Sequence, residues 1–194
     1  IVTDRMYREY LQLETQKQNY QEQLKQDDIQ RQMNQRVAEQ EQNERMKKLD
    51  PEVRKVIEQG ETFVYKIRQC NDAIPGEEIS AKISRMELIV ARIFDRVEQN
   101  PACVGDIRKL LEYYLPTTVK LLEAYEEMDA QPVYGENIQT AKKEIEATLD
   151  TLNAAFEKLL DNLFQDTAWD VSSDISVLNT MLYQEGLHED GLKK

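Results

Sequence analysis

The stretch EEISAKISRMELIVARIFDRVE, residues 77–98, decides the fold of this chain. Its apolar residues recur every three or four positions, which is the spacing of one face of an α-helix. The run of three apolar residues at 88–90 widens that face, as expected for a central helix of a bundle. We therefore predict a helix over about 77–98 with these inward positions: Ile79, Ile83, Met86, Val90, Ile93 and Val97.

Proline and glycine, the strongest interrupters of helices, mark where the neighbouring helices begin and end. The first fifty residues contain neither, and the prolines at 51, 75, 101 and 132 all fall between apolar patterns. Only Pro116 lies inside such a pattern, so we expect a kink or two abutting helices there. This distribution predicts an all-α fold of long helices.

Four more helices are predicted around the central one, over about 51–72, 103–128, 138–163 and 171–184. Asp50 followed by Pro51 is a typical helix start, and Gly186 is a typical helix stop. The inward positions predicted for these helices are Val53, Val56, Gly60, Phe63, Ile67 and Cys70, then Ile107, Leu110, Tyr114, Leu121, Tyr125 and Met128, then Ile138, Ala141, Ile145, Leu149, Leu152, Phe156, Leu159 and Leu163, and finally Ile175, Leu178 and Leu182.

Residues 1–50 read as one long, glutamine-rich helical arm. Met6, Tyr10, Leu13, Tyr20 and Leu24 follow the spacing of a coiled coil, with Lys17 in the missing core position. So thin an apolar seam cannot hold an isolated helix, which must therefore lie on its own bundle, on a second copy of the chain or on a partner. We predict an antiparallel helical bundle over 51–187, this coiled-coil-like arm in front of it, and a flexible tail at 188–194.

Charge narrows the classes of partner. The chain carries a net charge of −12, and residues 71–194 account for all of it, with twelve basic and twenty-four acidic residues. Such a domain repels nucleic acid and anionic lipid, so we expect neither as a direct partner. No run of about 18 apolar residues is present to span a membrane. Because the chain begins at Ile1 and not Met, we expect that it was excised from a longer protein.

Few residues in the sequence are suited to catalysis. The one histidine, His188, follows the last helix stop. The segment from Cys103 to Lys109 resembles the phosphate loop of cysteine-dependent phosphatases, but Arg108 comes one residue too early and no strand pattern precedes it. It reads better as the first turn of a helix with a buried cysteine. We predict no catalytic residue, no cofactor-binding residue and no cofactor.

The acidic series Asp161, Asp166, Asp170 and Asp174 is the best candidate for a metal site. Carboxylates bind hard divalent cations, and two acids one helical turn apart face the same way. Acids also gather at helix starts, where they cap free amides and oppose the macrodipole. Capping, by Thr167 with Asp170 or by Asp170 itself, accounts for the series better. We therefore predict no metal site, with Asp166, Asp170 and Asp174 as the only candidates.

Two stretches together resemble a known family. The first stretch is YLPTTVKLLEAY at 114–125. The second consists of AFEKLLDNLF at 155–164, DVSSDI at 170–175 and the run at 178–187. Over about 77–187, including GENI at 135–138, the chain resembles the bacterial 5-bromo-4-chloroindolyl phosphate hydrolysis proteins, or XpaC-like proteins. The resemblance implies a helical cytoplasmic protein, often preceded by membrane segments, with a link to toxic-anion (tellurite) resistance and a phosphatase label.

Two functions follow as hypotheses. The first is a non-catalytic helical scaffold or adaptor near the inner membrane face, which binds protein partners or itself through the arm and is membrane-anchored only through segments absent from this chain. The alternative is a metal-dependent phosphatase that uses the acids near Asp166, Asp170 and Asp174. The scaffold predicts exposed apolar surface, whereas the enzyme needs several carboxylates in one pocket.

Overall fold

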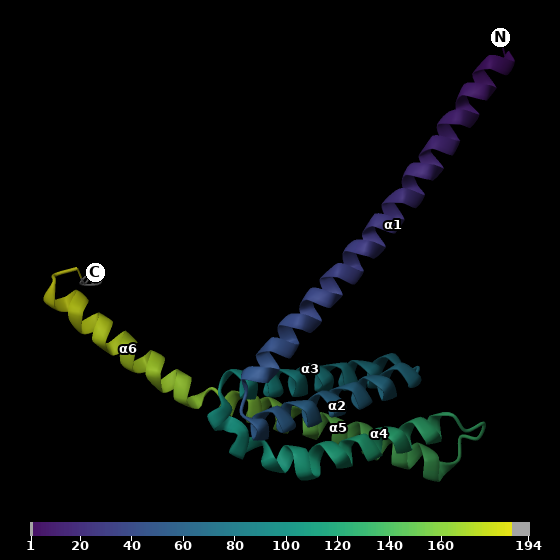
Figure 1. Cartoon of the computed structure of the whole chain (residues 1–194). Helices are drawn as coiled ribbons and strands as arrows, with labels where there is room; N and C mark the ends of the chain where they lie inside the picture. The colour runs from purple at the N-terminus through teal and green to yellow at the C-terminus, as the bar shows by residue number, and fades with distance from the viewer. Residues whose placement is uncertain (1, 188–194) are drawn as a thin grey trace, which may run out of the picture. The chain divides into compact units, whose positions relative to one another are not determined.

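The computed structural model describes residues 2–187, which form helices joined by short connections (Figure 1). No strand occurs in this described part of the chain, so the all-α prediction is confirmed. The chain divides into two compact units, with the boundary between Leu49 and Asp50. Each unit is described below by itself.

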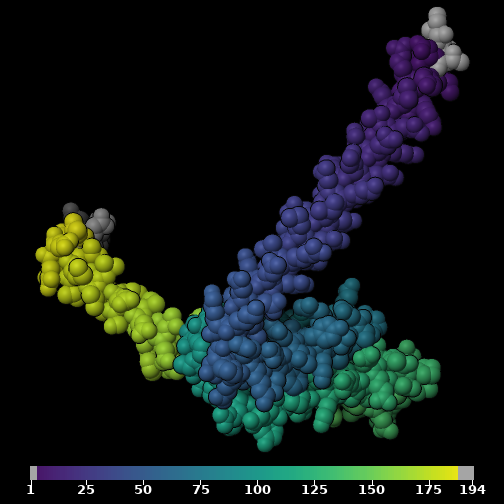
Figure 2. All heavy atoms as spheres, in the orientation of Figure 1, coloured from purple at the N-terminus to yellow at the C-terminus, as the bar shows by residue number. Residues whose placement is uncertain are grey.

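The first unit is a single helix, α1 (Val2–Lys48), of 47 residues. Its sequence contains no proline or glycine, and the predicted absence of a break is confirmed. Ion pairs one turn apart, such as Arg8 with Asp4 and Arg5 with Glu9, support the helix weakly. The space-filling view shows α1 as a single extended rod of side chains (Figure 2). Its large apolar side chains from Met6 to Val37 are exposed.

The second unit begins with a helical hairpin, α2 (Pro51–Ala73) and α3 (Glu77–Gln99). The predicted cap is confirmed, because the Asp50 carboxylate accepts a hydrogen bond of 2.9 Å from the amide of Glu52. The two helices run antiparallel, and the Asn71 side chain donates to the Ser84 hydroxyl across them.

A second antiparallel hairpin is made by α4 (Leu115–Asp129) and α5 (Glu136–Asn162). The Tyr125 hydroxyl of α4 donates to the Glu146 carboxylate of α5 at 2.7 Å. Burial first, and then this hydrogen bond, raise the pKa of Tyr125 far above its ordinary value. The phenol therefore stays protonated and keeps its donor role.

The two hairpins pack side by side into a four-helix bundle, in which α3 lies along α5 and α2 along α4 (Figure 1). The helices α3 and α5 are parallel, because Lys82 pairs with Asp150 and Arg85 pairs with Glu157 further along both helices. Since each hairpin is antiparallel, α2 and α4 are parallel as well. The largest fully buried side chains are shared among all four helices and the connection before α4: Phe156, Ile67, Ile83, Met86, Ile93, Ile107, Leu110, Leu115, Leu122, Leu149, Val90 and Val97.

The break expected at Pro116 takes the form of a π-helical turn. A 3₁₀ segment, η1 (Pro101–Ile107), leads into the π-helical η2 (Leu110–Tyr114), in which the Leu115 amide bonds to the Leu110 carbonyl. This i→i+5 spacing changes which residues face inward after it, although the predicted inward position Tyr125 is confirmed as buried. The sequence prediction of Tyr114, Leu121 and Met128 as inward positions is therefore wrong; the residues buried from there on are Leu115, Thr118, Val119, Leu122 and Tyr125.

The predicted inward positions of α3 are confirmed, but only part of the apolar run at 88–90, which was expected to widen this face, is buried. Ile89 and Phe94 are buried, whereas Leu88 is 58% exposed. Because α3 packs against both α2 and α5, its buried arc extends on the side of Ile89. In α2, similarly, Ile57 is the buried residue and Val56 is only partly covered.

The last helix, α6 (Gln165–Gln184), follows α5 almost directly and has no buried residue. The prediction that Ile175, Leu178 and Leu182 lie inward is wrong. The four helices of the bundle already cover its core, so no core surface is left against which the apolar face of α6 could pack. Gly186 does end the helix: its φ of 68° is the left-handed conformation that glycine adopts freely, and the Leu187 amide bonds back to the Leu182 carbonyl.

Candidate interaction surfaces

The acids proposed for a metal site form a row along one edge of α6. Asp166, Asp170 and Asp174 are exposed and lie in successive turns, so the first and third are about 12 Å apart along the axis. One cation cannot bridge that distance. Among residues 2–187, no three His, Cys, Asp or Glu side chains gather closely enough to hold a metal ion. The structure thus separates these residues along an exposed edge.

The predicted helix cap at this row is wrong. Because α6 starts at Gln165, Asp170 lies inside the helix, and the Phe164 position that precedes it provides no side-chain cap. Asp166 sits in the first turn, where its charge opposes the macrodipole. Asp161 belongs to the last turn of α5. His188 lies outside the described residues.

Cys103 does not build a phosphate loop. It is buried in η1, and its thiol points toward the Leu163 carbonyl at 3.9 Å. Burial raises the pKa of the Cys103 thiol, an effect that Arg96 partly opposes. Burial likewise raises the pKa of the Cys70 thiol. A thiol of raised pKa is a poor nucleophile, so both cysteines serve as small apolar core residues.

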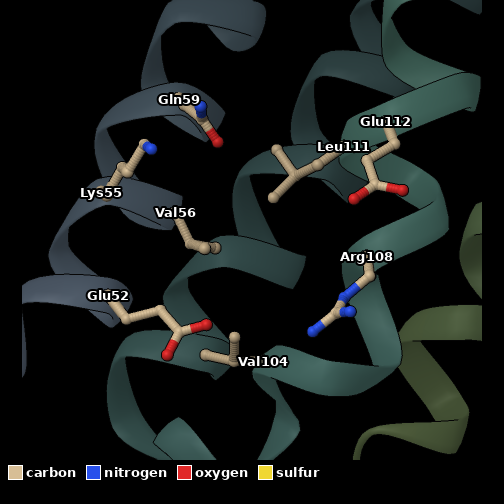
Figure 3. A pocket seen from close by; sticks show the side chains of 8 residues that line it. All are labelled: Glu52, Lys55, Val56, Gln59, Val104, Arg108, Leu111 and Glu112. Carbon is tan, nitrogen blue, oxygen red and sulfur yellow. The ribbon is translucent and has the colours of Figure 1, made fainter.

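A groove of about 350 Å³ lies between α2 and the segment that precedes α4 (Figure 3). Arg108 of the phosphate-loop-like segment lines it, but Cys103 does not. Each wall carries one acid and one base, so opposite charges offset each other across the groove. The side chains that line it are Glu52, Lys55, Val56 and Gln59 of α2 and Val104, Arg108, Leu111 and Glu112 opposite. This shallow, mixed lining contains no nucleophile and base pair.

A second groove, between α3 and α5, is lined in part by Asn153, a buried polar side chain that the sequence analysis missed. Asn153 is 5% exposed, and its amide donates to the Lys82 carbonyl at 3.0 Å. Its side-chain oxygen has no partner. A buried asparagine among apolar positions fixes how two helices align, because sliding them breaks its hydrogen bond. In the sequence, Asn153 lies between Leu149 and Phe156 at the spacing of the apolar residues, and this position could have indicated that it is buried.

Ion pairs border that groove on its exposed side. Lys82 bonds to Asp150 at 2.7 Å, and this hydrogen bond raises the pKa of Lys82. Arg85 pairs with Glu157, and its hydrogen bond lowers the pKa of that carboxyl. Each cation of the groove therefore already has a carboxylate partner, which leaves no free positive charge here to bind a phosphate.

The start of α6 is tied to the bundle by Arg96. Its guanidinium donates to the Leu163 carbonyl at 3.2 Å and to the Thr167 hydroxyl at 2.7 Å. It also stacks 4.3 Å from the centre of the Phe164 ring, a cation–π contact. These three contacts hold the α5–α6 turn and the first turn of α6, and they explain why α6 begins earlier than the sequence indicated.

Two helices expose apolar side chains along their length. In α1 these range from 45% exposed at Leu11 to 65% exposed at Met6. In α6, Val171, Ile175 and Leu178 are each more than half exposed. Long rows of exposed apolar side chains are a common feature of interaction surfaces. No helix within residues 2–187 is long and apolar enough to cross a membrane.

Comparison with known proteins gives one match. The sequence profile of a family described as 5-bromo-4-chloroindolyl phosphate hydrolysis protein matches residues 29–178. The match takes in part of α1, the whole bundle and most of α6, and it reaches further toward the N-terminus than the resemblance seen over 77–187. Among curated proteins and among solved structures, none matches the chain significantly.

Proposed function

The chain belongs to the family of 5-bromo-4-chloroindolyl phosphate hydrolysis proteins, and within that family we propose that it acts as a non-catalytic helical scaffold. In this proposal α1 pairs with α1 of a second copy, and the four-helix bundle is the rigid body that the pair carries. We propose that the protein acts at the cytoplasmic face of the membrane, a location that the family resemblance implies.

One observation carries this proposal: the large apolar side chains of α1 from Met6 to Val37 are exposed, although a helix of 47 residues with so thin a seam needs a covering surface to be stable. The exposed set is Met6, Tyr7, Tyr10, Leu11, Leu13, Tyr20, Leu24, Ile29, Met33 and Val37. Its first half keeps the alternating spacing of four and three that two supercoiled helices share.

Charge favours a second copy as the occupant of this seam. Residues 1–49 carry nine basic and nine acidic side chains, so two copies of the arm do not repel each other as a whole. The positions that flank the middle of the seam are neutral, namely Gln16, Gln21 and Gln23. Lys17 occupies a core position, and a polar residue there is a known means of fixing the register of a pair.

The test is the mass of the chain in solution, measured by sedimentation over a wide range of concentrations. The full chain is expected to form dimers, and Leu13→Glu with Leu24→Glu is expected to weaken the dimer by about 100-fold or more, because two apolar contacts per copy are lost. The matched control, Gln12→Glu with Gln26→Glu, adds the same charge on the outer face and is expected to leave the dimer intact. A monomeric chain, or a dimer that the leucine variant does not weaken, would contradict the proposal.

The second candidate is the hydrolysis of phosphate esters, the reaction that describes the family. It would need Asp166, Asp170 and Asp174 to act together on a metal, and their spacing along α6 opposes this. We expect the purified chain, given an indolyl phosphate with magnesium, manganese or zinc, to show no turnover above that of the Asp170→Asn, Asp174→Asn variant. Metal-dependent turnover that this variant loses would replace the scaffold by an enzyme.

A further inference from the structure

We propose that α6 is a docking surface for an amphipathic helix of a partner protein whose apolar stripe is bordered by lysine or arginine. This inference rests on the proposed scaffold function and names the kind of partner that the scaffold holds. It starts from the sequence of α6, in which Val171, Ile175, Leu178 and Leu182 are spaced by four, three and four residues. That spacing places them in one stripe along the helix.

Three of the four residues of the stripe are exposed in the folded chain, and Leu182 is half-buried. Val171 is 51%, Ile175 52% and Leu178 56% exposed, and Met181 beside them is 53% exposed. The contacts of Arg96 fix only the first turn of α6, where Thr167 and Phe164 lie. The stripe therefore continues past the anchored turn on a helix that is already formed, which lowers the ordering cost of binding.

The charges of α6 select the occupant. The helix carries Asp166, Asp170 and Asp174 and no lysine or arginine. Since these acids are four residues apart, they form a row on one side of the stripe that comes nearest to it at Asp174, while Ser172 and Asn179 on the other side are neutral. Two copies of α6 would bring acidic edges into the same interface, which is unfavourable. A helix with basic borders would instead pair with the acidic row.

A lipid surface fits the same helix less well. Helices that lie in membrane interfaces carry lysine and arginine on their polar face, whereas α6 has neither. Outside its stripe α6 carries three aspartates and three serines, together with the exposed apolar residues Trp169 and Val177. Anionic headgroups would be repelled by the same three aspartates that attract a basic helix. The three aspartates form no metal site. In this proposal they make the surface specific for a basic helix.

The experiment measures binding of two synthetic helical peptides to the full chain by fluorescence anisotropy. Both carry the same leucine stripe, bordered by lysines in one and by glutamates in the other. The lysine peptide is expected to bind at least about 10-fold more tightly, and this preference is expected to shrink as salt is raised. Equal binding of the two peptides, or no binding of the lysine peptide, would overturn the proposal.

Two pairs of variants assign the binding to α6. Ile175→Gln with Leu178→Gln keeps every charge and is expected to weaken the lysine peptide about 10-fold or more, whereas Ser176→Gln with Thr180→Gln, two exposed positions on the helix face away from the stripe, is expected to change it less than about 2-fold. Replacing the three aspartates by asparagine is expected to abolish the preference for lysine. Replacing three exposed acids elsewhere, Glu123, Glu127 and Glu144, by glutamine removes the same net charge and is expected to preserve it.

Other occupants of the stripe give their own results, and each would overturn the proposal. A lower melting temperature of the Ile175→Gln, Leu178→Gln variant would mean that the chain's own bundle covers the stripe. Self-association lost in that variant would mean a second copy, and binding to phosphatidylglycerol vesicles lost in it would mean a lipid surface. Repeating the peptide titration on the Leu13→Glu, Leu24→Glu chain separates this test from that of α1, because failure of arm pairing leaves peptide binding unaffected.

Discussion

Replacing Gly60 with leucine is expected to lower the free energy of unfolding by about 3 kcal/mol, because the new side chain has no room between α2 and α3. Gly60 is buried in α2, and a Cβ atom built there would lie 2.5 Å from Cγ and Cε1 of Phe94. The Phe94 ring is itself only 4% exposed, so it cannot swing into solvent without leaving the core. Glycine here permits the close approach of the two helices.

The measurement is urea unfolding followed by circular dichroism. Gly105→Leu is the matched control, since nothing lies within 4 Å of a Cβ atom at that glycine, and its effect is expected to stay within about 0.5 kcal/mol. In a double-mutant cycle, Gly60→Ala combined with Phe94→Ala is expected to cost less than the sum of the two single changes. Strict additivity, or a Gly60→Leu chain as stable as the parent, would refute this account of α2–α3 packing.

Replacing Phe156 with alanine is expected to lower the free energy of unfolding by about 3–5 kcal/mol, the range for removing a large aromatic side chain from a core. Phe156 is 2% exposed, and its ring meets that of Tyr114 edge to face, with centroids 6.4 Å apart. The side chain therefore joins α5 to the π-helical turn before α4. Its loss opens a cavity at the point where the two hairpins meet.

The same unfolding measurement serves here, with Tyr134→Ala as the control because Tyr134 is an aromatic residue that is 82% exposed. That control is expected to change stability by no more than about 0.5 kcal/mol. A cost below about 1 kcal/mol for Phe156→Ala would mean that α5 is not packed into the bundle core, against the arrangement described above.

Much of the fold could be predicted from local signals. Asp50 and Pro51 start α2, Gly186 ends α6, and the absence of breakers before Asp50 gives the uninterrupted α1. Even the disturbance at Pro116 was expected, although not its form. A π-helical turn depends on how Leu110 and Leu115 both reach the core, and single-sequence spacing assumes a constant period.

The candidate site was less predictable. The sequence put forward Asp166, Asp170 and Asp174 as weak candidates for a metal site, but it interpreted Asp170 as the cap of a helix beginning near Val171, whereas α6 begins at Gln165. The error arose because the start of α6 is fixed by Arg96, which lies in a different helix and is distant in sequence. For the same reason, the sequence did not predict the role of Asn153, since its hydrogen bond goes to the carbonyl of Lys82 in a different helix.

Local signals are enough to predict that this protein is helical, where most of its helices break and which of their faces are apolar, because helix formation depends on hydrogen bonds and breakers within a few residues. Which apolar faces pack together depends on tertiary contacts. The pairing of α3 with α5 through Lys82 and Asp150 joins residues far apart in the chain, and it closes the core with four helices. The face of α6 is left exposed as a result, since an apolar stripe reads the same in a sequence whether or not anything covers it.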